Sequence, residues 1–158
     1  MLALIGGIRA ENLTLSRNSI NFDGTLPAGQ PFTKTWTPVS YRGAVTLEPV
    51  KGIMLYGMYA TAYDPAAAGI SSVSPGTSLE LTNSRIYAAG VKTISDDKRL
   101  EATFAAFDIE RRNVYVALTN AVSTLAGEVH TRRVEFAAAV RPMDGLKFWG
   151  NIALTRAR

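Results

Sequence analysis

Few residues in this chain could carry out chemistry, and the imidazole of His130 is the first of them. The chain has 158 residues with one histidine and no cysteine, which excludes disulfides, thiolate metal sites and cysteine nucleophiles. His130 is closely followed by Arg132 and Arg133, and no Ser-His-Asp arrangement can be argued around it. We interpret it as an exposed residue at a strand end, and the sequence predicts that the protein is not an enzyme.

Two adjacent carboxylates, Asp96 and Asp97, have the ligand type of half a metal site. They lie within residues 95–99, between two apolar segments, where aspartate favours a tight turn. We interpret them as turn formers. The chain has neither a GxGxxG pattern nor a phosphate-binding P-loop. The sequence therefore predicts no cofactor and no metal bound directly by protein side chains.

The charge of the chain is moderately basic and widely spread. Seventeen Lys and Arg residues against 13 Asp and Glu residues give a net charge of +4. The basic residues are scattered, apart from the pairs 111–112 and 132–133, which is too diffuse for a nucleic-acid footprint. A content of 47% hydrophobic and 19% charged residues excludes a disordered tail. We expect a folded protein without a nucleic-acid partner.

The elements that must position these residues are strands. Apolar residues recur with period two far more often than with a period of about 3.6, and the segments are rich in Tyr, Phe, Val, Thr and Ala. Residues 1–8 lack the basic region of a signal peptide and are interpreted as a strand. No stretch approaches the roughly 18 apolar residues of a membrane-spanning helix, so strands would have to carry any membrane role. The chain is predicted to be all-β.

Alternation gives five segments one face that is free of charge, because successive strand side chains point to opposite sides. These faces comprise Gly43, Val45 and Leu47; Tyr87, Ala89 and Val91; Leu100, Ala102, Phe104 and Ala106; Val134, Phe136, Ala138 and Val140; and Leu146, Phe148, Gly150, Ile152 and Leu154. The opposite parity carries Arg42, Glu48, Lys92, Glu101, Thr103, Glu135 and Lys147. Residues 53–63 are apolar on both faces, which leaves their orientation open.

The connections between these segments alternate in length. Short turns are centred on Lys51, Asp97 and Met143. Long polar loops are expected at residues 17–35, 64–84 and 112–128. Strands of about ten residues or more with turns at one end and long loops at the other are typical of an outer-membrane barrel. A soluble sandwich also alternates, but its strands are usually about five or six residues long.

Several motifs resemble one family. Residues 82–92 (TNSRIYAAGVK) and 99–114 (RLEATFAAFDIERRNV) resemble the barrel of TonB-dependent siderophore receptors. Residues 127–135 (GEVHTRRVE) and 55–65 (LYGMYATAYDP) resemble further stretches of that barrel, in the same order along the chain. Ala88 and Arg133 depart from the family pattern, which indicates a divergent member.

The resemblance implies a partial antiparallel transmembrane β-barrel: about seven strands, forming an open curved sheet, of a barrel of about 22 strands. Residues 1–158 are expected to form this single partial barrel domain, without the plug domain and the remaining strands. The implied location is the outer membrane of a Gram-negative bacterium. The implied function is import of ferric siderophores, driven by the TonB complex through the plug, with outer-membrane lipid around the barrel. Iron would arrive as a chelate, so its binding would need no His or Cys ligand from the protein.

The resemblance also implies where a siderophore would bind. Aromatic rings and cationic side chains of the loops and the upper lumen are the candidates, namely Phe22, Trp36, Tyr63, Arg111 and Arg112. For the aromatic residues, the pattern favours an interfacial girdle or ordinary loop packing, and ligand binding is the alternative that the resemblance implies. Two other functions stay open from the sequence: a passive or structural outer-membrane β-barrel, and a soluble β-sandwich sugar-binding module.

Overall fold

The computed structural model describes residues 1–18, 20–26, 31–64, 80–119, 122–125 and 127–158. The strands are β1 (Leu2–Ala10), β2 (Leu13–Arg17), β3 (Phe32–Trp36), β4 (Val39–Val50), β5 (Ile53–Asp64), β6 (Thr82–Ile94), β7 (Leu100–Arg112), β8 (Tyr115–Thr119), β9 (Val122–Leu125), β10 (Glu128–Met143) and β11 (Leu146–Ala157). This part of the chain contains no helix that is long and apolar enough to cross a membrane.

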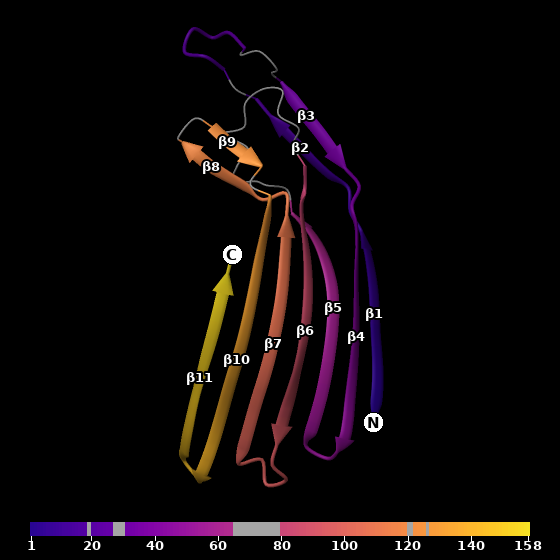
Figure 1. The fold of residues 1–158 in the computed structure, drawn as a ribbon, viewed down its shortest axis with the longest axis vertical. Coiled ribbons are helices and arrows are strands. Elements are labelled where there is room, and N and C mark those ends of the chain that lie inside the picture. Colours follow the sequence, from indigo (N-terminus) through magenta and orange to yellow (C-terminus); the bar gives the residue numbers. More distant parts are fainter. Residues whose placement is uncertain (19, 27–30, 65–79, 120–121, 126) are drawn as a thin grey trace.

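Seven long strands form one antiparallel sheet in the order β1-β4-β5-β6-β7-β10-β11. Figure 1 shows them side by side in a single layer, with β1 and β11 at the two edges. The hairpins β2-β3 and β8-β9 are separate two-stranded sheets beyond the upper ends of the long strands. The prediction of an all-β chain with seven antiparallel strands in an open sheet is confirmed. The single layer rules out the sandwich alternative, which requires two stacked sheets.

Two of the three predicted long loops contain short strands, which the sequence pattern did not predict. β3 begins within residues 17–35 and ends at Trp36, and β8 and β9 lie within residues 112–128. The first hairpin is held by hydroxyl pairs across its strands, Thr14 with Thr35 at 3.0 Å and Ser16 with Thr33 at 3.3 Å. These hydroxyl pairs stabilise one side of the ribbon, and the other side carries Leu13, Leu15, Phe32 and Trp36 together with Arg17 and Lys34. Residues 65–79 of the other predicted loop lie outside the described residues.

The short turns all lie at the lower rim, as predicted, with one change of position. Lys51 and Gly52 connect β4 to β5, and residues 95–99 connect β6 to β7. The third turn is at Asp144 and Gly145, whereas Met143, its predicted centre, is the last residue of β10. A register shift between Val140 and Met143 adds residues to β10 and moves the turn onward.

Asp97 organises the middle turn through its carboxylate. It accepts a hydrogen bond from the Ser95 hydroxyl at 2.5 Å and another from the Arg99 backbone N–H at 3.1 Å. The Ser95 bond first, and the Arg99 bond second, hold the pKa of Asp97 below its usual value of 3.8. Asp96 instead forms an ion pair with Lys51 at 2.8 Å, which links this turn to the preceding one. The interpretation of both aspartates as turn residues is confirmed.

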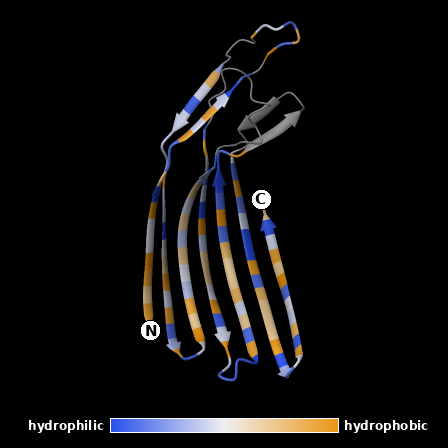
Figure 2. Cartoon of the chain, turned by 180° about the vertical axis from the view of Figure 1, so that it is seen from behind, coloured by the Kyte–Doolittle hydropathy of each residue, from blue (hydrophilic) through white to orange (hydrophobic). Residues whose placement is uncertain are grey.

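The pairing register puts all five predicted charge-free faces on the same side of the sheet, which we call the apolar face. One row across the sheet runs through Leu47, Leu55, Val91, Phe104, Phe136 and Ile152. The other side, which we call the mixed face, carries the charged residues predicted to oppose them, such as Lys92 and Glu135. Hydrophobic and hydrophilic residues alternate along the long strands as this requires (Figure 2). The open orientation of residues 53–63 is also settled, since Leu55 and Tyr59 lie on the apolar face.

The sheet has almost no core of its own. Only Leu81, Ala88 and Ala105 are buried apolar residues in the described part of the chain, and the last two lie on the mixed face. On the apolar face, Phe104 and Phe136 remain nearly half exposed. Side chains therefore converge on the mixed face and splay apart on the apolar face, which identifies the mixed face as the inner side of the curved sheet.

We predict that Gly52→Ala lowers the free energy of unfolding more than Gly145→Ala. Both glycines have positive φ, 82° and 81°, where an added Cβ costs about 1–2 kcal/mol. A Cβ at Gly52 would also collide with the carbonyl oxygen of Ile94, whereas one at Gly145 meets open space. Denaturant unfolding of the protein and of each variant measures both losses, and equal losses would contradict this interpretation of the turn.

Candidate functional site

The apolar face changes character toward its upper end. Above the apolar rows, Tyr41, Tyr59 and Tyr87 form a row across β4, β5 and β6. Their ring centroids are separated by 5.9 Å and 4.8 Å. Tyrosine combines an apolar ring with a polar hydroxyl, so such rows mark the boundary between a hydrocarbon layer and water. The row therefore marks the upper limit of the apolar surface.

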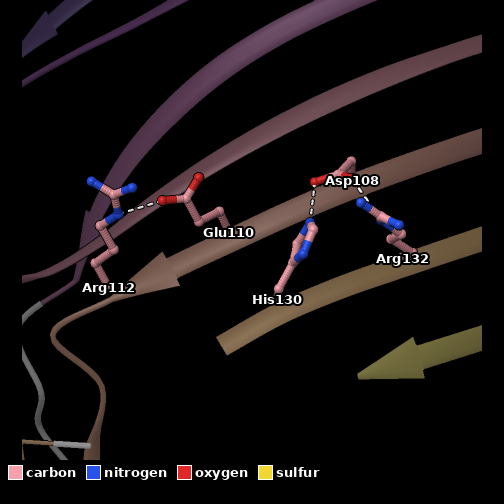
Figure 3. A network of polar contacts seen from close by, with 5 residues as sticks. All are labelled: Asp108, Glu110, Arg112, His130 and Arg132. Atoms are coloured by element: carbon pink, nitrogen blue, oxygen red, sulfur yellow. Dashed lines mark hydrogen bonds and ion pairs between the residues drawn. The ribbon is translucent and has the colours of Figure 1, made fainter. Parts of the chain in front are cut away.

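Charged residues continue the tyrosine row across β7 and β10 on the same face. The Asp108 carboxylate on β7 lies 2.6 Å from Nε2 of His130 and 3.2 Å from Nε of Arg132, both on β10 (Figure 3). Register fixes the arrangement, because Asp108 pairs directly with Arg132 and is diagonal to His130. We call these three residues the Asp108 network. The carboxylate thus bridges an imidazole and a guanidinium, so the network is an ion-pair arrangement.

A second ion-pair arrangement lies one row higher. Arg112, the last residue of β7, forms an ion pair with Glu110 on its own strand (Figure 3). It forms a second ion pair with Glu128 on β10, at 3.6 Å. The end of β7 is fixed next to it by Asn113, which has a φ of 57°. Its side-chain amide donates to the Leu81 carbonyl at 3.3 Å, and the Thr82 hydroxyl donates to the Asn113 carbonyl at 3.0 Å.

The mixed face holds open hollows lined by polar and small side chains. In its middle, the Tyr56 ring lies so close to Gly90 that a Cβ there would be 2.6 Å from the Tyr56 hydroxyl. The Lys92 ammonium is 5.7 Å from the centroid of the same ring. A larger hollow of about 540 Å³ lies over β7, β10 and β11 and is lined by Glu101, Thr103, Ala137, Ala138, Ala139, Lys147, Trp149 and Asn151, with Ala102 and Gly150 at its margin. The mixed face can therefore contact water, and its hollows have room for other chain segments or solutes.

The five predicted ligand-binding residues are spread over the upper part of the molecule. Phe22 is fully exposed in the turn between β2 and β3, and Trp36 ends β3 with its ring 5.2 Å from the Lys34 ammonium. Tyr63 lies near the end of β5. Arg111 and Arg112 are consecutive in β7 and therefore point to opposite faces, Arg111 to the mixed face. Their role in ligand binding stays a prediction.

Sequence reasoning missed the tyrosine row and the Asp108 network, although the signal was present. The parity that places Phe104 on the apolar face also places Asp108 and Glu110 there. The same parity carried back from Val134 places Arg132 and His130 on that face. The alternating pattern was interpreted only over its apolar residues, so the charged residues that continue it were not assigned to a face. His130 is accordingly half-buried and paired, which corrects the expectation of an exposed strand-end residue.

The family of the chain follows from a comparison with known proteins. Residues 1–158 match the family model described as TonB dependent receptor-like, beta-barrel. The chain belongs to this family. A search of curated proteins found no match.

Three solved structures share the fold. The ferric-catecholate import receptor Fiu from Escherichia coli K12 superimposes with a TM-score of 0.74 at 18% identity, covering 99% of this chain and 25% of that one. The siderophore receptor PiuA from Acinetobacter baumannii gives 0.79 at 18%, covering 99% and 23%. The FrpB iron transporter from Neisseria meningitidis gives 0.71 at 17%, covering 99% and 24%. The chain thus spans about a quarter of the length of these receptors.

Membership of the TonB-dependent receptors fixes the general role and explains the two faces. Proteins of this family are receptors and transporters of the Gram-negative outer membrane and not enzymes. In such barrels an outward apolar band flanked by aromatic residues meets lipid, and the interior is polar. Short turns lie on the periplasmic side and longer loops outside. The apolar face, the tyrosine row and the lower-rim turns of this chain correspond to these features in position.

We predict that Phe104→Arg lowers the yield of folded receptor in bilayers, whereas Thr103→Arg is tolerated. Phe104 lies in the middle of the apolar face, where an arginine in hydrocarbon costs about 2–4 kcal/mol. Thr103, its neighbour in β7, lines the open hollows of the mixed face, where an arginine meets water. The yield is measured from the difference in gel mobility between heated and unheated samples. Equal losses, or the reverse order, would show that the faces are assigned the wrong way round.

Proposed function

We propose that this chain is part of the wall of an outer-membrane receptor that imports ferric siderophores. The observation that carries the proposal is the sheet itself: seven antiparallel strands with one apolar and one mixed face. The same arrangement is found in the ferric-catecholate import receptor Fiu, the siderophore receptor PiuA and the FrpB iron transporter. The motifs of residues 82–92 and 99–114 support the same substrate class through their resemblance to siderophore receptors.

The two sheet edges support the proposal that further strands complete the barrel. β1 and β11 each pair on one side only. In hydrocarbon every unpaired N–H or C=O group costs several kcal/mol, so an edge of about ten residues is incompatible with lipid. Closure removes both edges. We propose that the complete receptor supplies the missing strands and a plug, through which the TonB complex drives transport.

The siderophore would meet the upper and inner surfaces. Trp36 and Phe22 offer aromatic rings beyond the sheet, and Tyr63 offers another at its upper end. Arg111 brings a cation to the mixed face, where its guanidinium is 3.9 Å from the Asp64 carboxylate. Arg112 contributes a second cation, engaged with Glu110 and Glu128. These groups would contact the organic part of an anionic chelate, so the iron needs no ligand from the protein.

Transport assays in cells without other iron receptors test the function. The complete receptor is expected to take up a ferric siderophore and to lose that uptake when its plug or TonB is removed. Arg111→Gln is expected to reduce the uptake. Lys51→Gln, on the opposite rim, is the matched control and should leave uptake unchanged. Uptake of a corrin or of an oligosaccharide in place of the iron chelate would refute the substrate class. Passage that does not depend on TonB would favour a passive barrel.

A further inference from the structure

A small basic pocket lies on the apolar face next to the Asp108 network. It has a volume of about 120 Å³ and is lined by His130, Arg132, Arg156 and Arg158. Arg132 pairs directly with Arg156 across β10 and β11, and the backbones of His130 and Arg158 exchange two hydrogen bonds of 3.0 Å. All four residues therefore point to the same side of the sheet as Phe136 and Ile152.

Positive charge in this pocket exceeds the negative charge beside it. Arg132 is paired with Asp108, the carboxylate that contacts the pocket residues. Arg156 and Arg158 make no side-chain hydrogen bond or ion pair with any described residue. Glu110, in the same row as His130, and Glu128, one row further, are engaged by Arg112. Among the pocket residues and Asp108, three guanidinium groups face one carboxylate, which leaves an excess of positive charge for an anion to neutralise.

The surface directly below the pocket is apolar and uncovered. The next rows are Val134 with Leu154 and Phe136 with Ile152. Leu154 is 68% exposed and Ile152 is 60% exposed, so nothing in the described chain covers this surface. Asp108, Arg132 and Arg156 lie in the same row across the sheet as Tyr59 and Tyr87. In a bilayer this row would lie at the level of the lipid headgroups, with acyl chains below it.

We propose that this pocket binds the phosphate of a lipid in the outer leaflet, whose acyl chains lie along Val134, Leu154, Phe136 and Ile152. Guanidinium groups match phosphate because their planar fork donates two parallel hydrogen bonds. Asp108 is the positioning residue, since its carboxylate orients His130 and Arg132 toward the pocket. The inference rests on the proposed outer-membrane role, because that role places the apolar face against lipid. Continuity of the cationic pocket with an exposed apolar strip favours a lipid over a soluble phosphate or an acidic protein segment.

The test uses the complete receptor in phosphatidylcholine nanodiscs with lipid A, a phosphorylated glycolipid, or with lipid A whose phosphates have been removed. Retained lipid is counted by native mass spectrometry. We expect the phosphorylated form to bind preferentially and Arg156→Gln to weaken it about tenfold, as for loss of a hydrogen bond to a charged group. Arg133→Gln is the matched control, because Arg133 lies one residue from Arg132 on the mixed face, paired with Glu135.

Folding and function are separated from lipid binding by two further measurements. Arg156→Lys keeps the charge and should retain most of the binding, and heated and unheated gel mobilities confirm that each variant is folded. Equal binding of both forms of lipid A, equal effects of Arg156→Gln and Arg133→Gln, or full displacement by inorganic phosphate would each overturn the proposal. Ferric siderophore uptake is assayed in parallel. Lipid binding without uptake would refute only the proposed function, and uptake without phosphate-dependent lipid binding would refute only this site.

Discussion

Backbone hydrogen bonding is the constraint on which the rest of this structure depends. Only three apolar residues are buried among those described, so packing in a core does not hold the strands together. The ladders between neighbouring strands do, and they satisfy the N–H and C=O groups that a lipid environment would leave unpaired. Once the ladders fix the register, the period of two sends every even-numbered side chain of β7 to one side, and a slip by one residue would turn charges such as Lys92 and Glu135 toward lipid.

The same constraint explains what the sequence alone could predict. The alternation around Phe104, Phe136 and Ile152 was sufficient to predict the strands, their number and which residues share a face. It was sufficient because apolar residues at every second position of a strand all lie on one side. The Lys51 and Asp97 turns were predictable from local turn chemistry. The strand β3 was not, because it has only five residues and Lys34 interrupts its apolar side between Phe32 and Trp36. The end of β10 was misplaced because a bulge is invisible in alternation.

The candidate sites were harder to predict than the fold, for a physical reason. A cross-strand contact such as that of Asp108 with His130 joins residues 22 positions apart, and only the register of β7 against β10 brings them together. The predicted ligand residues come from loops and strand ends, where register no longer constrains position. Arg111 and Arg112 illustrate the limit, since adjacent residues of one motif serve opposite faces. Charge is thus sorted by face and by height: charged residues occur all along the inner side, whereas on the outer side they begin at the tyrosine row.

The central claim is that the apolar face meets lipid while the mixed face does not. Nitroxide labels placed singly at residues 100–106 of β7, in the complete receptor reconstituted in bilayers, test it directly by their accessibility to oxygen and to a water-soluble nickel chelate. The account predicts high oxygen accessibility at Leu100, Ala102, Phe104 and Ala106 and low values at the three residues between them. Accessibility without a period of two, or with the opposite phase, would contradict it.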